Sequence, residues 1–188
     1  MNGIKQLLAY ANIGEAGVSW YDDARDYIWS VCEREGWDMS EFINVFAITS
    51  PRVSVMRNWE GTVEYFTTGS LPWGFIKSTR TALKHYEQTH EIRGPKTSAF
   101  ARALHGDTTA LVLDVWMAKA LDVDPLKVTT KGNMRKALLR VKAVARLKGW
   151  SVRDTQAAIW WGICRASGVR PGNLQDAAQA TSQMSLEF

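Results

Sequence analysis

Hydrophobic residues recur at the spacing of an α-helix along most of this chain, and this periodicity limits the fold more than any other sequence feature. Trp20, Ala24 and Tyr27 share one helical stripe, and Asp38 with Glu41 forms a capping pair at the start of the next helix. The alternation of period two that half-buried strands show is nearly absent. The sequence therefore predicts an all-α protein of about eight helices.

Proline and glycine divide the chain between these helical segments, as at Ser50-Pro51, Gly94-Pro95 and Asp124-Pro125. From residue 171 the chain becomes polar, so we expect residues 171–188 to form a flexible tail. The expected helices cover about residues 20–35, 38–48, 53–66, 72–86, 97–104, 115–121, 134–147 and 151–166.

Composition excludes several classes of protein. No apolar run is long enough to span a bilayer, and the first residues lack the order of charges and apolar residues in a secretory signal. Cys32 and Cys164 are too few for a disulfide framework or a four-cysteine metal site, and both lie within helical patterns that predict a core position. His85, His90 and His105 lack the spacing of metal ligands. We therefore expect a cytoplasmic protein without a metal or cofactor.

Positive charge is concentrated in one segment. Between residues 125 and 153 there are nine basic residues and no acidic residue, whereas residues 1–41 hold three basic and eight acidic residues. Such a segment is typical of proteins that bind a polyanion, although a solvated helix face would look the same. Charge alone does not separate DNA, RNA and an anionic membrane, but the segment lacks the large aromatic residues of a membrane-surface helix.

Two short segments carry residues suited to chemistry. Gly94 precedes a predicted helix, whose free N–H groups suit a phosphate, and Lys96 lies at the start of that helix. Asp114 follows an apolar run and is placed to cap the next helix, where N–H donors favour an ionised carboxylate. Lys96 and Asp114 are 18 residues apart, so they could face one cleft. Each also has a purely structural interpretation, as a surface lysine and a helix cap.

The segments Gly94-Pro95-Lys96-Thr97-Ser98-Ala99 and Leu113-Asp114-Val115-Trp116-Met117 resemble the signature of the helix-hairpin-helix DNA glycosylases, the superfamily that includes endonuclease III. The resemblance is specific over about residues 86–121. The chain departs from the family by keeping one hairpin glycine of two, by lacking the four-cysteine cluster motif, and by having Trp116 in place of a histidine.

This resemblance implies a fold and a mechanism. We expect one helical unit over residues 1–170, in which a middle lobe of about 40–121 and a second lobe of 1–39 plus 122–170 flank a DNA cleft. The target base would be flipped out of the duplex. Asp114 would stabilise the positive charge that develops on the sugar, and Lys96 would attack C1′ to form a Schiff base. If Lys96 does not reach the sugar, water would be the nucleophile.

The remaining site predictions concern DNA contacts. Arg52, after Ser50-Pro51, is the candidate wedge that fills the gap left by a flipped base. The base pocket would draw on aromatic and amide side chains, with Trp59, Trp160 and Trp161 as further stacking candidates; most of these aromatic residues would also suit the core. The predicted DNA-binding residues are Arg52, Arg93, Gly94, Thr97, Lys131, Arg135, Lys136, Arg140 and Lys142, and the predicted base-pocket residues are Trp20, Tyr21, Asn58 and Trp116.

Two further resemblances concern origin and partners. Trp20-Tyr21-Asp22-Asp23-Ala24 resembles the start of a group of small phage proteins, which would place the chain in a host bacterial cytoplasm. The final six residues resemble the peptide that binds the bacterial sliding clamp, with Gln183, Leu186 and Phe188 as anchors; chance or a cloning remnant would give the same match. We expect a monomer that binds double-stranded DNA and no membrane.

Three functions remain open from the sequence. The first is a DNA glycosylase, with or without lyase activity at abasic sites. The second is an enzyme of the same fold that modifies DNA bases, as some phage relatives do, and the third is a non-catalytic DNA-binding module that uses the basic helix. Covalent trapping of DNA and mass analysis of nucleosides would separate them.

Overall fold

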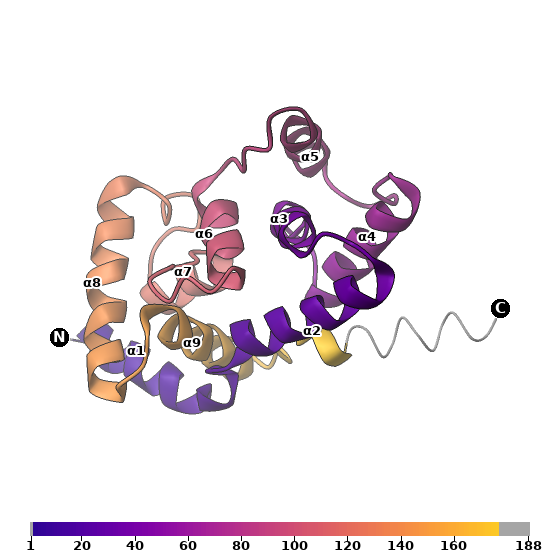
Figure 1. Ribbon diagram of the computed structural model, residues 1–188. Helices are drawn as coiled ribbons and strands as arrows, with labels where there is room; N and C mark the ends of the chain where they lie inside the picture. Colours follow the sequence, from indigo (N-terminus) through magenta and orange to yellow (C-terminus); the bar gives the residue numbers. More distant parts are fainter. Residues whose placement is uncertain (1, 177–188) are drawn as a thin grey trace. The chain divides into compact units, whose positions relative to one another are not determined.

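The computed structural model describes residues 2–176, and the regular structure within that range is helical throughout (Figure 1). Nine α-helices and one short 3-10 helix follow one another between residues 2 and 166, and residues 174–176 are helical as well. Their bounds are α1 (Asn2–Ile13), η1 (Glu15–Gly17), α2 (Trp20–Glu35), α3 (Met39–Thr49), α4 (Val55–Thr68), α5 (Lys77–Thr89), α6 (Pro95–Leu104), α7 (Val115–Leu121), α8 (Lys131–Lys148) and α9 (Val152–Ala166). The predicted all-α class is confirmed for this part of the chain.

Helix starts follow the capping signals of the sequence. The side chains of Asp38, Asp114 and Ser151 each accept a hydrogen bond from a backbone N–H in the first turn of the following helix. These three predicted starts are therefore confirmed. Ser54 caps α4 in the same way, one residue after the expected start of that helix.

The expected helices need two corrections. No helix was predicted before residue 20, yet α1 covers Asn2–Ile13. The prediction missed it because its buried residues, Leu7 and Ala11, are too few to show a helical period in the sequence. Packing in the core of unit 1 stabilises this helix. The helix expected from residue 72 begins only at Lys77. Residues 72–76 form a loop, because Gly74 adopts a positive φ of 101° and Phe75 turns into the core.

The described chain forms two compact units. Within the described residues, unit 1 consists of residues 2–22 with 102–171, and unit 2 of residues 23–101 with 172–176. The lobes implied by the resemblance, with bounds near 40 and 121, remain a prediction. No helix within residues 2–176 is long and apolar enough to span a membrane.

Unit 1 is built around the contact between α1 and α9. Glycines allow these elements to touch through their backbones: a Cβ atom on Gly162 would lie 1.9 Å from the carbonyl oxygen of Tyr10, and one on Gly14 would lie 2.0 Å from that of Ala158. Helices α7 and α8 complete the core. Its largest fully buried side chains are Leu7, Met117, Leu121, Val141 and Ile159.

Unit 2 surrounds α3, whose residues 42, 43 and 45–49 are all buried. Aromatic rings cover one side of this helix, where Phe42 packs against Trp37, Trp59 and Phe66 at centroid distances of 5.0–5.8 Å. Aliphatic and aromatic residues of α5 and of the loop before it cover the other side, with Val45 and Ile48 of α3 in the same cluster. A helix this apolar is stable only with neighbours all round it.

Candidate active site

The carboxylate of Asp114 is held by two N–H donors in unit 1. Its Oδ1 atom accepts a hydrogen bond from the backbone N–H of Met117 at 2.8 Å, and its Oδ2 atom accepts one from Nε1 of Trp160 at 3.0 Å. The first contact is the helix cap that the sequence predicts. The second comes from α9, 46 residues further along the chain. Hydrogen bonds to both oxygens fix the orientation of this carboxylate.

Packing explains why Asp114 and Trp160 meet. Val112 and Leu113 are buried, so the chain enters the core of unit 1 just before Asp114. Helix α7 then packs on α9, which carries Trp160. The Trp160 ring also lies 6.1 Å from the ring of Trp20, centroid to centroid. Trp160, expected only as a stacking or core residue, is therefore a hydrogen-bond donor to Asp114.

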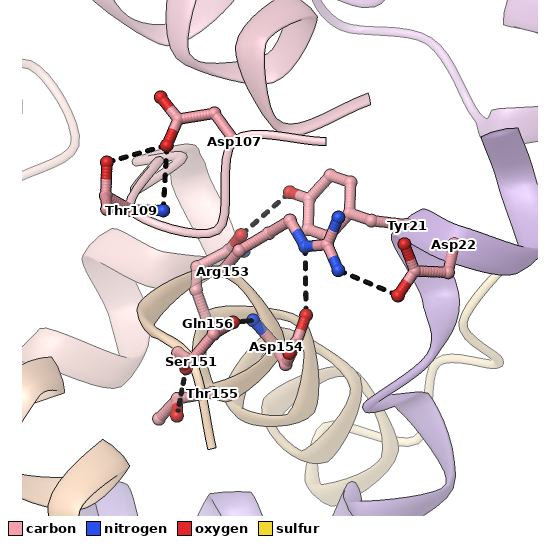
Figure 2. A network of polar contacts seen from close by, with 9 residues as sticks. All are labelled: Tyr21, Asp22, Asp107, Thr109, Ser151, Arg153, Asp154, Thr155 and Gln156. Atoms are coloured by element: carbon pink, nitrogen blue, oxygen red, sulfur yellow. Dashed lines mark hydrogen bonds and ion pairs between the residues drawn. The ribbon is translucent and has the colours of Figure 1, made fainter. Parts of the chain in front are cut away.

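The same unit contains a polar network around Arg153 and Tyr21 (Figure 2). Arg153 is only 4% exposed and pairs with Asp22 at 2.7 Å and with Asp154 at 2.9 Å. Its guanidinium carbon lies 5.9 Å from the centre of the Tyr21 ring. A buried arginine needs such partners because an unpaired charge in the interior would be costly.

Tyr21 is fixed within this network. The ring is buried, and its hydroxyl donates a hydrogen bond to Oε1 of Gln156 at 2.7 Å. Burial and the negative charge of Asp114 raise the pKa of the Tyr21 phenol far above its usual value, so the hydroxyl stays protonated. Tyr21 and Trp20, both predicted base-pocket residues, pack edge to face at 5.0 Å within unit 1.

The other two predicted base-pocket residues lie in different surroundings. Trp116, on α7, is half-buried, and the Nζ atom of Lys119 lies 5.4 Å from the centre of its ring. Asn58 is buried in unit 2, where its amide donates to the carbonyl oxygen of Phe46 at 2.9 Å. Its Oδ1 atom has no hydrogen-bond partner among the described residues. Asn58 thus joins α4 to α3, a role that the sequence analysis did not consider.

Lys96 lies in unit 2, in the first turn of α6. Its Nζ atom donates a hydrogen bond to Oγ of Ser50 at 2.6 Å and lies 5.5 Å from the centre of the Phe100 ring. The amine is thus half-buried between a hydroxyl and an aromatic face. Lys96 belongs to unit 2 and Asp114 to unit 1.

The segment before Lys96 has a helix, a five-residue loop and a second helix. Helix α5 ends at Thr89, and α6 begins at Pro95 after Gly94, whose φ is 94°. The backbone N–H of Ser98 donates to the carbonyl oxygen of Gly94 at 2.9 Å, and its hydroxyl donates to that of Ile92. These bonds hold the turn, while Arg93 is exposed and Thr97 is half-buried.

Arg52 is exposed on the turn that follows Ser50, and its backbone is unusual. Its φ of 63° lies in the left-handed region, which residues other than glycine and asparagine seldom adopt. A side chain presented on such a turn suits the wedge role predicted for Arg52, and strained backbones are frequent at functional sites.

The basic segment of residues 125–153 divides into two groups. Three cations are engaged within unit 1: Arg140 donates to the carbonyl oxygens of Leu121 and Gly3, Lys148 pairs with Glu15, and Arg153 is buried. The other six are exposed, namely Lys127, Lys131, Arg135, Lys136, Lys142 and Arg146. The segment therefore presents fewer cations to a ligand than its composition indicates, and Arg140, a predicted DNA contact, is a packing residue.

Some predictions fall elsewhere. Gln183, Leu186 and Phe188, the anchors of the clamp-like tail, lie outside the described residues. Within residues 2–176, no group of three or more His, Cys, Asp or Glu side chains could hold a metal ion. Cys32 and Cys164 are buried, as the sequence predicts, and burial raises the pKa of their thiols to about 11 and about 12 respectively.

Comparison with known proteins places the chain in a family without indicating an activity. Residues 8–165 match a family described as a family of unknown function, DUF7178. Comparisons with curated proteins and with solved structures find no match.

Proposed function

The chain belongs to that family of unknown function, and we propose that it is a DNA base-processing enzyme that cleaves the N-glycosidic bond of a flipped base. The observation that carries this proposal is the Asp114 carboxylate, held by N–H donors of Met117 and Trp160 at 2.8 and 3.0 Å. An oriented, ionised carboxylate stabilises a sugar that becomes positively charged in the transition state.

The proposed reaction breaks the bond between the base and C1′ and forms a bond between C1′ and Lys96. The base departs with the electrons of its bond to C1′ and takes up a proton, while positive charge develops on the sugar opposite the Asp114 carboxylate. The neutral amine of Lys96 attacks C1′. The bond between C1′ and the ring oxygen O4′ then breaks, one amine proton passes to O4′, and C1′ and the Lys96 nitrogen form an iminium ion. Borohydride would convert that ion to a stable amine by hydride transfer. Contacts with Ser50 and Phe100 hold the Lys96 amine in one place, at the start of α6.

Charge on the surface of unit 1 supports a polyanionic ligand, which the proposal takes to be DNA. Lys131, Arg135, Lys142 and Arg146 are exposed on α8, and at 100° per residue they fall within one narrow stripe. The stripe runs along the axis of α8, so its cations can contact successive phosphates of one strand.

The same stripe favours a second candidate function, a DNA-binding module without catalysis. This candidate needs the exposed cations of α8 but neither Lys96 nor Asp114. A binding module would leave the DNA that it binds chemically unchanged, whereas an enzyme would alter it. An enzyme that modifies bases instead of removing them would change nucleoside masses without releasing a base.

Borohydride trapping tests the proposal. Duplexes carrying uracil, hydroxymethyluracil, 8-oxoguanine, an alkylated base or an abasic site are incubated with the wild type and with Lys96→Gln, Asp114→Asn and Lys5→Gln. We expect an adduct on at least one duplex that is lost in Lys96→Gln and kept in Lys5→Gln, since Lys5 is an exposed lysine of α1. Asp114→Asn should bind DNA normally but release no base.

The outcomes assign the activity. An adduct that survives in Lys96→Gln would refute the role of Lys96 as nucleophile. Base release without an adduct would indicate water as the nucleophile. If mass analysis of nucleosides finds neither base release nor a modified base while DNA still binds, the enzyme proposal is wrong and the binding module remains.

A further inference from the structure

Trp73 is the most exposed large hydrophobic residue among those described, with 92% of its surface accessible. It lies in unit 2, in the loop of residues 69–76 between α4 and α5. Leaving an indole ring in water forgoes the stabilisation that its burial would give. Single exposed apolar residues are common on protein surfaces, so the setting of Trp73 decides whether it has a role.

The backbone on either side of Trp73 is braced by two arginines. Arg80 donates to the carbonyl oxygens of Leu71 and Pro72, and Arg57 donates to the carbonyl oxygen of Trp73 itself. Three successive carbonyl groups are therefore fixed by guanidinium groups of α4 and α5. A ring presented on a braced loop loses little backbone freedom when it binds a ligand.

A glycine turn directs neighbouring rings in opposite directions. Gly74 has a φ of 101°, and after it Phe75 is buried against Gly61. Phe75 and Leu71 anchor the two ends of the loop in the core of unit 2. Because both anchors point inward, the fold keeps the Trp73 ring in solvent.

The surroundings of Trp73 are cationic. Residues 65–86 contain no acidic residue, and α5 begins four residues after Trp73. Lys77, Arg80 and Lys84 are exposed at positions i, i+3 and i+7 of that helix, so they share one face. A hollow of about 470 Å³ lies beside this face and is lined by Lys77, Ser78, Thr81, Ala82, His85 and Arg93.

A second exposed tryptophan provides a comparison. Trp29 on α2 is 54% exposed, but its helix carries Asp22, Asp23, Asp26, Glu33 and Glu35. A polyanion would be repelled there. Of the two exposed indoles in unit 2, Trp73 alone combines a braced loop with a face of positive charge.

We propose that Trp73 and the cationic face of α5 form a binding site for an unpaired base of DNA. The indole ring stacks on the base, and Lys77 and Lys84 contact the flanking phosphates. Stacking on an aromatic side chain is open to any base, so the site selects unpaired over paired nucleotides and not one sequence. The proposal rests on the proposed function only in taking DNA as the polyanion.

The test measures dissociation constants by fluorescence anisotropy for a labelled single-stranded oligothymidine, a duplex with a two-base bulge and a fully paired duplex. Trp73→Ala should weaken binding to the single strand and to the bulge by about tenfold and leave the paired duplex nearly unchanged. Trp29→Ala is the matched control and should bind like the wild type. Both variants should keep the wild-type melting temperature, because neither ring is buried.

The role of Lys77 and Lys84 is tested separately, through the salt dependence of DNA binding. Replacing Lys77 and Lys84 with Gln should reduce the dependence of single-strand affinity on salt, by about 0.7 in the logarithmic slope for each lost phosphate contact. An unchanged slope would show that α5 does not contact the phosphates, and it would overturn that part of the proposal.

Other outcomes separate this inference from the proposed function. If Trp73→Ala binds all three DNAs like the wild type, the base site is wrong, whatever the trapping experiment shows. If Trp73→Ala loses a wild-type affinity for vesicles of phosphatidylcholine and phosphatidylserine but still binds DNA like the wild type, the face is a membrane contact and the inference is overturned. A wild type that binds none of these DNAs contradicts both proposals. If the affinity for single-stranded DNA depends on Trp73 but no base is released, the base site is supported and the enzyme proposal is wrong.

Discussion

The hydrogen bond from Trp160 to Asp114 is the contact on which the proposed chemistry depends most. The backbone N–H of Met117 holds one carboxylate oxygen as any helix cap would, whereas the indole N–H holds the other from a separate helix. A hydrogen bond to a charged group contributes more than one between neutral groups, about 1.5–3 kcal/mol. Trp160 therefore acts as a positioning residue for Asp114.

Trp160→Phe should lower the rate of base release at saturating DNA by about 10- to 100-fold, because the carboxylate loses one of its two donors. The affinity for DNA should stay unchanged, since Trp160 is not placed in the DNA contact. Single-turnover rates and binding isotherms on the duplex that is processed fastest give this comparison.

Trp161→Phe is the matched control. Its indole Nε1 is buried without a hydrogen-bond partner among the described residues, so removing it should leave the rate unchanged. Equal losses of rate in the two variants would mean that the aromatic packing of α9, and not the hydrogen bond, supports the activity.

At the scale of the element, α8 has two faces with different tasks. Lys131, Arg135, Lys142 and Arg146 are exposed along one stripe, and Arg140 lies on the opposite side with its guanidinium on backbone carbonyl groups. The net charge of the segment does not distinguish exposed cations from cations that pack within the unit. Their positions around the helix separate the residues that we propose to contact DNA from those that pack within unit 1.

Replacing the four stripe residues with Gln should weaken binding to all DNA sequences and reduce the logarithmic salt slope by about 0.9 for each lost phosphate contact. The melting temperature should change little, because these side chains are exposed. Binding titrations between low and high salt measure the slope.

Arg140→Gln should behave in the opposite way, with a lower melting temperature and an unchanged salt slope, because its guanidinium joins α8 to the ends of α1 and α7. If Arg140→Gln reduced the slope as much as a stripe residue does, the division of α8 into two faces would be wrong.

At the scale of the whole molecule, the two units have separate cores and each contains one buried cysteine. Cys164 lies in unit 1 and Cys32 in unit 2. Burial raises the pKa of both thiols, to about 12 and about 11, so neither is a thiolate near pH 8. Each cysteine therefore reports the opening of its own unit.

Gly162→Ala should destabilise unit 1 by about 2–3 kcal/mol, because the added methyl group would lie 1.9 Å from the carbonyl oxygen of Tyr10. Pulsed thiol labelling followed by mass analysis should then find Cys164 modified faster than in the wild type. Labelling of Cys32 should rise less.

Gly132→Ala serves as the control, because a Cβ atom there would meet nothing within 4 Å. This variant should label both cysteines at the wild-type rate. Equal acceleration of both cysteines in Gly162→Ala would show that the units open together.

Local sequence patterns were enough to predict the class of the fold, most helix bounds and the capping role of Asp114. These properties depend on neighbours within one or two turns, where periodicity and capping residues act directly. The sequence also located the basic segment and the lysine at the start of α6. The predicted start of α5, at Pro72, was wrong. The burial of Phe75 and the turn at Gly74 outweighed the preference of proline for the first turn of a helix.

Only the tertiary structure decided which side chains share a contact. Trp160 reaches Asp114 across 46 residues, Arg140 turns inward while its neighbours on α8 remain exposed, and Trp73 is held in solvent by arginines from two helices. The chain cannot encode such contacts locally, because each depends on how distant segments pack. Hydrogen-bond partners and exposure are properties of that packing, and residue type alone leaves them open.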